Sequence, residues 1–417
     1  MSGIRVNEWL HNSGTGGIWQ TSAGNVGIAS SVPTNKLEVT GDAKISGITT
    51  AKAFVPTAGQ FGNRNLIING ACNVAQRGTS YTGDVQGLQT VDRFKLGWSG
   101  ADAIIEQHQE QLSNSDTGPW EKGFRNAYKL VNGNQSGGAG AADYVEIEYK
   151  VESQDLASSG WDYNNTSSYI ALSFWVKSSV AQTFYGQIRT DQSTSQTYSF
   201  STGSLSANTW TKITRIIPGR TGITLANSNA HGISIKWAPF WGTDRTASGV
   251  TLDAWHTTDN AARIPDMTST WWTTNDSTFH ITGLQLEVGP VVTPFEHRIF
   301  ADELQRCLRY YWKCGGDNGD SIGISGNAWA ANYVVFQVQH PVHMRTTPTF
   351  VGYNDCRFQA QTDSASFDAA TMSIQSSTVD GKTMLLAKSG TSGATAGEGG
   401  SLNSQEDGMY ISFSAEL

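Results

Sequence analysis

Apolar and polar residues alternate with a period of two along most of the chain from residue 64 onwards. In the stretch 143–152, for example, Val145 and Ile147 alternate with Glu146 and Glu148. This pattern is typical of a β-strand that buries one face and exposes the other to water. Comparable patterns predict strands over 66–68, 90–98, 101–109, 126–133, 143–152, 168–179, 183–190, 197–202, 210–219, 232–241 and 277–289. About ten short strands separated by turn residues predict a jelly-roll β-sandwich over residues 64–300.

A second set of alternating stretches occupies the C-terminal part of the chain. They predict strands over 332–342, 347–353, 370–376, 382–390 and 409–417. We expect these strands to form a small β-sandwich over 315–417, with the Gly/Ser/Ala-rich stretch 388–401 as a loop exposed at one end. Because the last predicted strand runs to the end of the sequence, Leu417 is expected to be ordered.

The two sets of strands are separated by a helical pattern. Gly289–Pro290 stops the preceding strand, and Asp302 with Glu303 favours a helix N-terminus. Further apolar residues recur at helical spacing up to Lys313, before a Cys–Gly–Gly sequence. We therefore predict a linking helix over 301–314. The aromatic residues at its end are expected to pack at the junction between the two β domains: Tyr310, Tyr311 and Trp312.

The first 63 residues have only short apolar pairs between Gly, Ser, Thr and Asn, such as Ile45 with Ile48. Each piece is too short to bury a core within one chain. The segment is therefore either disordered or ordered by winding with copies of itself. In the second case Leu37 and Val39 are expected to face the axis between subunits, with Glu38 facing water. The fold class expected for the whole chain is all-β.

Composition excludes several functional classes. With 15% charged residues and a net charge of −8, the 417-residue chain lacks the basic character of a duplex DNA binder. No apolar run reaches the length of a membrane span, and the first residues have no apolar core of signal-peptide length. The four cysteines show no metal-binding spacing, so we expect buried free thiols. No cofactor, nucleic-acid partner or membrane insertion is expected.

The residues between 237 and 272 have the composition of a glycan-binding surface. Indole rings offer flat apolar faces on which the C–H groups of a sugar ring stack, while Asp and Arg side chains bind its hydroxyls. The alternatives are that this long segment buries its own aromatic residues or contacts another subunit. The candidate residues are Trp237, Trp241, Asp244, Arg245, Asp253, Trp255, His256, Trp271 and Trp272.

Two further groups of residues are weaker candidates, one for a catalytic set and one for a calcium site. Asp253, His256 and Asp259 contain the residue types of a catalytic set, but neither a nucleophile nor a spaced carboxylate pair accompanies them in the sequence. The stretch 317–320, Asp-Asn-Gly-Asp, has oxygen ligands at calcium-like spacing without a complete loop. We expect an exposed turn there, no bound metal, and no enzyme activity.

Several stretches resemble bacteriophage proteins. NLIINGACNVAQRGTSY (65–81), TVDRF (90–94), FWVKSS (174–179), the stretch 281–313, HPVHMRTTPTF (340–350) and ISFSAEL (411–417) resemble the C-terminal module of tail-fibre and tail-associated proteins. Residues 24–47 look like shaft segments of phage fibres, including those of marine cyanobacterial phages. The resemblance implies a homotrimeric virion protein in which a jelly roll akin to carbohydrate-binding modules precedes a distal β domain.

The function implied is that of a tail fibre that adsorbs the phage to host surface polysaccharide. In this interpretation residues 1–63 trimerise and attach to other tail or baseplate proteins, and the protein is assembled in the host cytoplasm and resides on the virion tail. Two alternatives stay open. One is a structural component of the baseplate or capsid that binds no receptor, and the other is a tailspike that cleaves polysaccharide.

Overall fold

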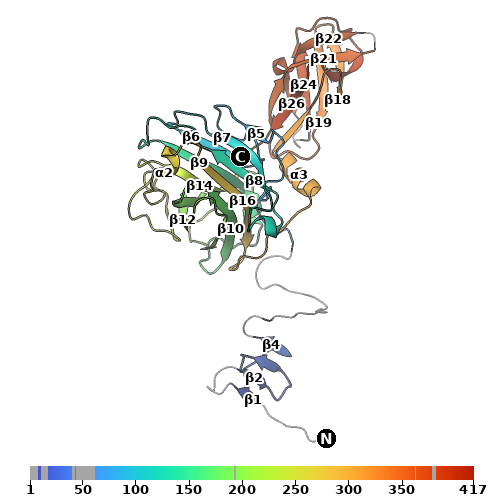
Figure 1. Cartoon of the computed structure of the whole chain (residues 1–417). Helices are drawn as coiled ribbons and strands as arrows, with labels where there is room; N and C mark the ends of the chain where they lie inside the picture. Colours follow the sequence, from blue (N-terminus) through green and yellow to red (C-terminus); the bar gives the residue numbers. More distant parts are fainter. Residues whose placement is uncertain are drawn as a thin grey trace. The chain divides into compact units, whose positions relative to one another are not determined.

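A computed structural model describes residues 8–10, 17–39, 43, 62–191, 194–361, 363–377 and 382–417. The chain divides into two compact units, Met1–Pro56 and Thr57–Leu417, and each is treated by itself. The described residues are mostly β structure in antiparallel sheets, with a few short helices (Figure 1). The all-β prediction is therefore confirmed.

The first unit contains a small four-stranded sheet. Its strands are β1 (Glu8–Leu10), β2 (Gly17–Gln20), β3 (Val26–Ile28) and β4 (Leu37–Val39), in that order, and β3 and β4 run parallel. The pairing of Val26 with Leu37 and of Ile28 with Val39 places Leu37 and Val39 on one face. Glu38 lies on the opposite face, where its carboxylate accepts hydrogen bonds from Ser30 and Thr34.

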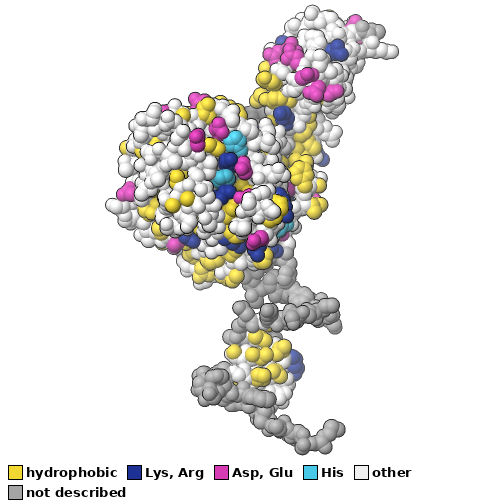
Figure 2. All heavy atoms as spheres, in the orientation of Figure 1, with side chains coloured by type: hydrophobic (Ala, Val, Ile, Leu, Met, Phe, Trp, Pro, Cys, Tyr) yellow, Lys and Arg dark blue, Asp and Glu magenta, His cyan; other side chains and the backbone are white. Residues whose placement is uncertain are grey.

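The face that carries Leu37 is apolar and open. Ile18 lies opposite Ile28 in the neighbouring strand, so it belongs to the same face. Ile18 is 46% exposed, Ile28 41% and Leu37 63%. Hydrophobic side chains gather on this small sheet in the space-filling view (Figure 2). Ile45 and Ile48, which the sequence also placed in this segment, lie outside the described residues.

In the second unit, residues 64–300 form two six-stranded antiparallel sheets. The first consists of β13 (Thr211–Pro218), β10 (Tyr169–Ser178), β16 (Thr278–Val288), β8 (Asn126–Val131), β7 (Glu106–Gln111) and β5 (Ser80–Tyr81). The second consists of β15 (Trp255–Thr257), β12 (Gln196–Ser204), β11 (Thr183–Thr190), β14 (His231–Trp241), β9 (Tyr144–Glu152) and β6 (Lys95–Ser99). Rings from opposite sheets meet in one core, as in the edge-to-face contact of Phe174 with Trp237 at 5.5 Å between centroids.

The predicted strand over 66–68 is wrong. These residues are not in a strand, because their backbone groups find other partners. The N–H of Leu66 donates to the carbonyl of Leu286, whereas that of Ile68 donates to the phenolic oxygen of Tyr149. Asn69 then takes a left-handed conformation with φ of 61°, and its turn ends the stretch.

The linking helix is shorter than predicted. Helix α3 spans Phe300–Leu308, and strand β17 (Tyr311–Gly316) follows it directly. The predicted helix end near Lys313 is therefore wrong, because pairing of Tyr311 to Gly316 with the last strand, β26 (Met409–Ser414), overrides the helical spacing. The remaining short helices are η1 (Trp120–Lys122), α1 (Ser153–Ala157), α2 (Thr270–Thr273) and η2 (Ala369–Thr371).

Tyr310 and Tyr311 lie at the junction of the two β domains, as predicted. The guanidinium of Arg93 lies 3.5 Å from the ring centre of Tyr310, and that of Arg77 lies 3.6 Å from that of Tyr311. Both guanidiniums also pair with Glu416 near the chain end. Trp312 instead stacks on Phe413, inside the C-terminal domain.

The C-terminal domain has a three-stranded and a seven-stranded sheet around an apolar core. The first contains β17, β26 and β20 (Thr349–Tyr353). The second contains β22 (Ser364–Asp368), β21 (Asp355–Ala360), β25 (Gly399–Ser404), β18 (Ser321–Ala330), β19 (Tyr333–Gln339), β24 (Thr383–Ser389) and β23 (Ser373–Ser377).

The prediction of a loop over 388–401 is therefore wrong in part, because residues 399–401 belong to β25, an inner strand of this sheet. At Gly400 an added Cβ would lie 2.5 Å from the carbonyl oxygen of Gln359, so glycine permits the close strand contact there. Leu417 is among the described residues, and β26 ends three residues before it.

Two absences apply to the described residues alone. None of their helices combines the length and apolar character that crossing a membrane requires. They also contain no group of three or more His, Cys, Asp or Glu side chains placed to hold a metal ion.

The four cysteines are free, and burial raises the pKa of Cys72 to about 12, which keeps its thiol protonated.

Candidate functional site

The structure buries four of the predicted glycan-binding tryptophans. Trp237 and Trp241 are 1% exposed, and Trp271 and Trp272 are 0% exposed. The indole N–H of Trp271 donates to the carbonyl of Thr278 at 3.1 Å, and that of Trp272 donates to the carbonyl of Gly138. The prediction that these four rings form a sugar platform is therefore wrong. Trp237, Trp271 and Trp272 belong to the core between the two jelly-roll sheets, whereas Trp241 packs beneath the 242–267 loop, so burial of the aromatic residues, one of the alternatives, is what the structure shows.

Trp241 is the tryptophan that packs beneath the loop. A register shift after Trp237 turns Ala238 and Trp241 to the outer side of the second sheet. Residues 242–267 then cover this side, with Ile264 fully buried against Trp241. The ring of Trp241 is therefore beneath the loop and unavailable to a ligand.

The other five predicted residues lie around the same loop and are partly or fully exposed. Asp253 pairs with Arg215 at 2.9 Å, and Arg245 stacks over Tyr144 at 4.0 Å. The indole N–H of Trp255 donates to a backbone carbonyl at 2.7 Å. Asp244 and His256 complete the set, and Nε2 of His256 lies 3.2 Å from the hydroxyl of Ser199. Internal partners thus occupy most of these groups.

The weaker candidates also have local partners. The carboxylate of Asp259 accepts from the N–H of Ala261 at 2.9 Å, and no contact among Asp253, His256 and Asp259 joins them in the described part of the chain. In the stretch 317–320 the backbone N–H of Asp317 donates to the carboxylate of Asp320 at 3.0 Å, and all four residues are exposed. The arrangement is that of an exposed turn, as expected.

A different surface has the character of a binding site. Strand β18 presents a tryptophan among small polar side chains, since Ser325, Asn327 and Trp329 are exposed while Ile324 and Ala328 lie in the core. The side chain of Trp329 is 56% exposed, and its ring centre lies 6.0 Å from that of Tyr333. A large ring held open on a sheet face is typical of a contact surface.

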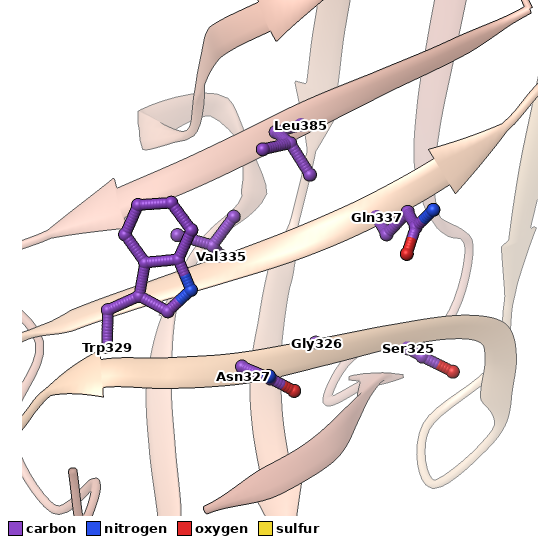
Figure 3. A pocket seen from close by; sticks show the side chains of 7 residues that line it. All are labelled: Ser325, Gly326, Asn327, Trp329, Val335, Gln337 and Leu385. Carbon is purple, nitrogen blue, oxygen red and sulfur yellow. The ribbon is translucent and has the colours of Figure 1, made fainter. Parts of the chain in front are cut away.

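Neighbouring strands complete a shallow cavity of about 230 Å³ beside this indole. Asn327 lies opposite Val335 in β19, and Ser325 lies opposite Gln337. In Figure 3 the indole ring lies beside the Val335 side chain, with Leu385 on the next strand. The lining residues are Ser325, Gly326, Asn327, Trp329, Val335, Gln337 and Leu385 (Figure 3).

The polar side chains of this cavity are available to a ligand. Among the residues that the structure describes, the side chains of Ser325, Asn327 and Gln337 have no hydrogen-bond partner, although their backbones pair with neighbouring strands. Two amides and a hydroxyl supply both donors and acceptors, as sugar hydroxyls require, beside an apolar face for stacking. None of the lining side chains is ionisable, so binding to this surface is expected to be independent of pH.

The sequence did contain a signal for this surface. Ser325, Asn327 and Trp329 alternate with small residues, but the inner positions include Gly326 and Ala328, which carry little hydrophobic signal. Glycine stands at 326 because an added Cβ would meet the ring of Phe336 at 2.6 Å. The strand was therefore missed, and the exposed tryptophan with it.

Comparisons with known proteins give structural similarities only. No protein-family model matches the chain, and no curated protein matches it. The enzymatically active domain of tailspike protein 4 of bacteriophage CBA120 is similar with a TM-score of 0.28 and 12% identity, over 54% of this chain and 21% of that chain. The chain thus spans about a fifth of the length of that tailspike structure.

Two bacterial modules are also similar. The N-terminal cellulose-binding domain of β-1,4-glucanase C from Cellulomonas fimi aligns with a TM-score of 0.24 and 10% identity, over 53% of this chain and 99% of that domain. A xylan-binding domain from Paenibacillus barcinonensis aligns with a TM-score of 0.25 and 13% identity, over 46% of this chain and 91% of that domain. The chain is thus similar in structure to carbohydrate-binding modules and to a phage tailspike domain.

Proposed function

We propose that this protein is a phage tail fibre that adsorbs the virion to a polysaccharide of the host surface. The observation that carries the proposal is the exposed indole of Trp329, set beside the unpartnered side chains of Asn327 and Gln337 on an open sheet face. The resemblance of residues 65–81, 281–313 and 411–417 to tail-fibre proteins supports a place on the virion.

The lining of the cavity supports a binding role and a neutral sugar ligand. Its seven residues include no carboxylate pair and no nucleophile beside a base, which cleavage of a glycosidic bond requires. They also include no charged residue, so the sugar unit is held by stacking and neutral hydrogen bonds. Such contacts are individually weak, with net contributions of about 0.5–1.5 kcal/mol per hydrogen bond.

Valency then raises the strength of adsorption. The apolar face formed by Ile18, Ile28 and Leu37 supports self-association of the first unit, and we propose a homotrimer. Three sites held on one fibre bind a repeating polysaccharide with an avidity that can exceed the single-site affinity by about 10²–10⁴. The remaining N-terminal residues are proposed to attach the fibre to other tail or baseplate proteins.

A structural role without receptor binding is the second candidate. Exposed apolar side chains in the segment before α3 and at its first residue favour it, because they fit contact with another virion protein: Val291 is 65% exposed, Ile299 69% and Phe300 57%. In that case the protein is a baseplate or capsid decoration. The location of the protein on virions, seen by immunogold electron microscopy, separates a distal fibre position from a baseplate or capsid position.

The decisive experiment measures retention on host polysaccharide and on a glycan array. Wild type is compared with Trp329→Ala and with the control Tyr353→Ala, because Tyr353 is 53% exposed in the same domain but outside the cavity. We expect Trp329→Ala to lose retention and Tyr353→Ala to keep it. Retention of no glycan by the wild type, or equal retention by both variants, overturns the proposal. Release of reducing ends from the polysaccharide would establish a cleaving tailspike instead.

A further inference from the structure

A second cleft lies on the outer face of the first jelly-roll sheet, distant in sequence from the Trp329 surface. Its volume is about 450 Å³, within the usual size of small-molecule sites. Strands β10, β13 and β16 form its floor, and the segments around residues 122–124 and 292–297 form its walls. The lining residues are Lys122, Phe124, Ser173, Trp175, Lys212, Gly283, Val292, Thr293, Pro294, Phe295 and His297.

An irregularity in the sheet gives the cleft its aromatic floor. The pairing of β10 with β16 shifts between Ser173 and Trp175, and Gly283 takes a left-handed φ of 64° at this bulge. An added Cβ on Gly283 would lie 2.7 Å from the ring of Phe124 and 3.0 Å from that of Trp175. Glycine at this position thus lets both rings approach the backbone. Phe124 is 2% exposed and supports the floor from within, whereas Trp175 is partly exposed and faces the cleft.

The wall facing this floor is held in place by buried charges. The carboxylate of Glu287, which is 2% exposed, accepts from the hydroxyl of Thr293 at 2.6 Å and from its N–H at 2.8 Å. Arg64 lies 3.4 Å from the same carboxylate, and Arg298 pairs with Glu296 at 3.2 Å. The acidic groups of this wall are therefore compensated.

Two ammonium groups of the cleft have no such partner. Lys212 lies directly opposite Trp175 in the neighbouring strand, and Lys122 comes from the other side of the cleft. Both are exposed, and within the described part of the chain neither has a carboxylate within 4.0 Å. His297 belongs to the second wall and contacts the first, since one ring nitrogen is 2.8 Å from the carbonyl of Lys122. The cleft therefore combines an aromatic floor with uncompensated positive charge.

We infer that this cleft binds an acidic sugar unit, a pyranose that carries a carboxylate. The sugar ring stacks on the indole of Trp175, and the carboxylate accepts charge-assisted hydrogen bonds from Lys212 and Lys122. The hydroxyl of Ser173, which has no partner among the described residues, serves a sugar hydroxyl. This inference rests on the proposed adsorption to polysaccharide and adds that the polysaccharide contains uronate units.

The test uses the full chain and two matched probes, hexagalacturonate and its fully methyl-esterified form, with binding measured by isothermal titration calorimetry. The two probes differ in charge but share the sugar ring. We expect the ester to bind about tenfold more weakly than the acid, because the ester cannot accept charge-assisted hydrogen bonds from the two ammonium groups. Binding of the acid should also weaken as NaCl rises from about 0.05 M to about 0.5 M.

Variants assign the effect to the cleft. The double variant Lys122→Gln with Lys212→Gln should bind the acid about tenfold more weakly, for the same reason. The control Lys95→Gln also removes one lysine charge from the same domain. Lys95 pairs with Glu148 at 3.7 Å, outside the cleft, so this variant should bind the acid as wild type does. Circular dichroism of each variant checks that the fold is retained.

The outcomes separate this inference from the proposed function. Equal binding of acid and ester, no binding of the acid by wild type, or unchanged binding by the double variant overturns the inference. Tyr353→Ala should leave hexagalacturonate binding unchanged, because that ring lies outside both cavities. If Trp329→Ala abolishes adsorption to host polysaccharide while the lysine variants bind uronate as wild type, the adsorption proposal stands and the cleft assignment fails. If no variant changes adsorption to host polysaccharide but the double lysine variant weakens uronate binding, the cleft assignment stands and the adsorption proposal fails.

Discussion

The carboxylate of Glu152 accepts two hydrogen bonds from the guanidinium of Arg309, at 2.8 and 2.9 Å, although Glu152 is 0% exposed. The phenol of Tyr310 donates to the same carboxylate at 2.6 Å. Glu152 ends strand β9 of the jelly roll, whereas Arg309 and Tyr310 follow helix α3. The ion pair of Glu152 with Arg309 therefore holds the segment that leads into the C-terminal domain against the second jelly-roll sheet.

Removal of Arg309 should destabilise this connection. In Arg309→Met the buried Glu152 carboxylate loses its charged partner, and breaking such a pair costs about 3 kcal/mol of the free energy of unfolding. Urea denaturation followed by tryptophan fluorescence measures the change. Arg306→Met is the control, since Arg306 lies on the same helix and donates to Asn63 at an exposed site. Equal losses in the two variants would contradict the role assigned to the pair.

Acid should destabilise the jelly roll through His280. Burial, helped by the charges of Lys177 and Lys129, lowers the pKa of His280 to about 3 in the folded protein. In the unfolded chain the imidazole takes up a proton near its ordinary pKa of about 6.5. The unfolded state therefore binds more protons as the pH falls below about 6.5, so the free energy of unfolding falls by about 1.4 kcal/mol per pH unit for this one proton.

The variant His280→Gln isolates this contribution from the carboxylates that titrate in the same range. Its stability relative to wild type should rise progressively between pH 7 and pH 4, because the variant has no imidazole to protonate. Urea denaturation at several pH values gives the difference. A difference that stays constant over this range would show that His280 does not remain neutral in the folded state.

Alternation predicted the jelly roll well, because its strands place large apolar residues inward. The predicted strand 183–190 is β11 to the residue, and 168–179 and 232–241 differ from β10 and β14 by one residue at the ends. The signal failed where the inward positions include glycine, alanine or serine, as in β18 and β25, since these residues add little to a hydrophobicity pattern. It also failed at β17, where pairing with a distant strand decides the structure.

The candidate site was harder to predict, because residue type alone does not determine which side of a sheet a ring faces. Trp241 is the last residue of β14 and Trp329 the last but one of β18, yet a loop covers Trp241 and leaves it 1% exposed. Composition selected the segment with the most tryptophans. Three of its four buried rings pack into the core of the sandwich and Trp241 packs beneath the adjoining loop, whereas Trp329 lies on an open sheet face.

Self-association of the first unit should depend on its open apolar face. The double variant Ile28→Ser with Leu37→Ser removes two exposed apolar side chains from this face, and each contributes about 1.5–3 kcal/mol if a neighbouring copy buries it. We expect wild type to sediment as a trimer and the variant to dissociate in analytical ultracentrifugation. Val32→Ser is the control, since Val32 is 76% exposed but lies outside the strands. Dissociation by the control, or none by the double variant, contradicts a role for this face.

Truncation of buried and exposed tryptophans should have opposite consequences for stability and binding. Trp272→Ala empties a fully buried position beside Phe240, whose ring centre lies 5.1 Å away, and should lower the free energy of unfolding by about 3–5 kcal/mol. Trp329→Ala removes a ring that is 56% exposed and should change it by less than about 0.5 kcal/mol. Thermal unfolding and glycan retention are measured on both proteins. Below its unfolding transition, any folded Trp272→Ala protein should retain the glycan, whereas folded Trp329→Ala should not. A stable Trp272→Ala protein that fails to bind would return the sugar site to the 237–272 segment, because only direct contact with the ligand would then account for the loss.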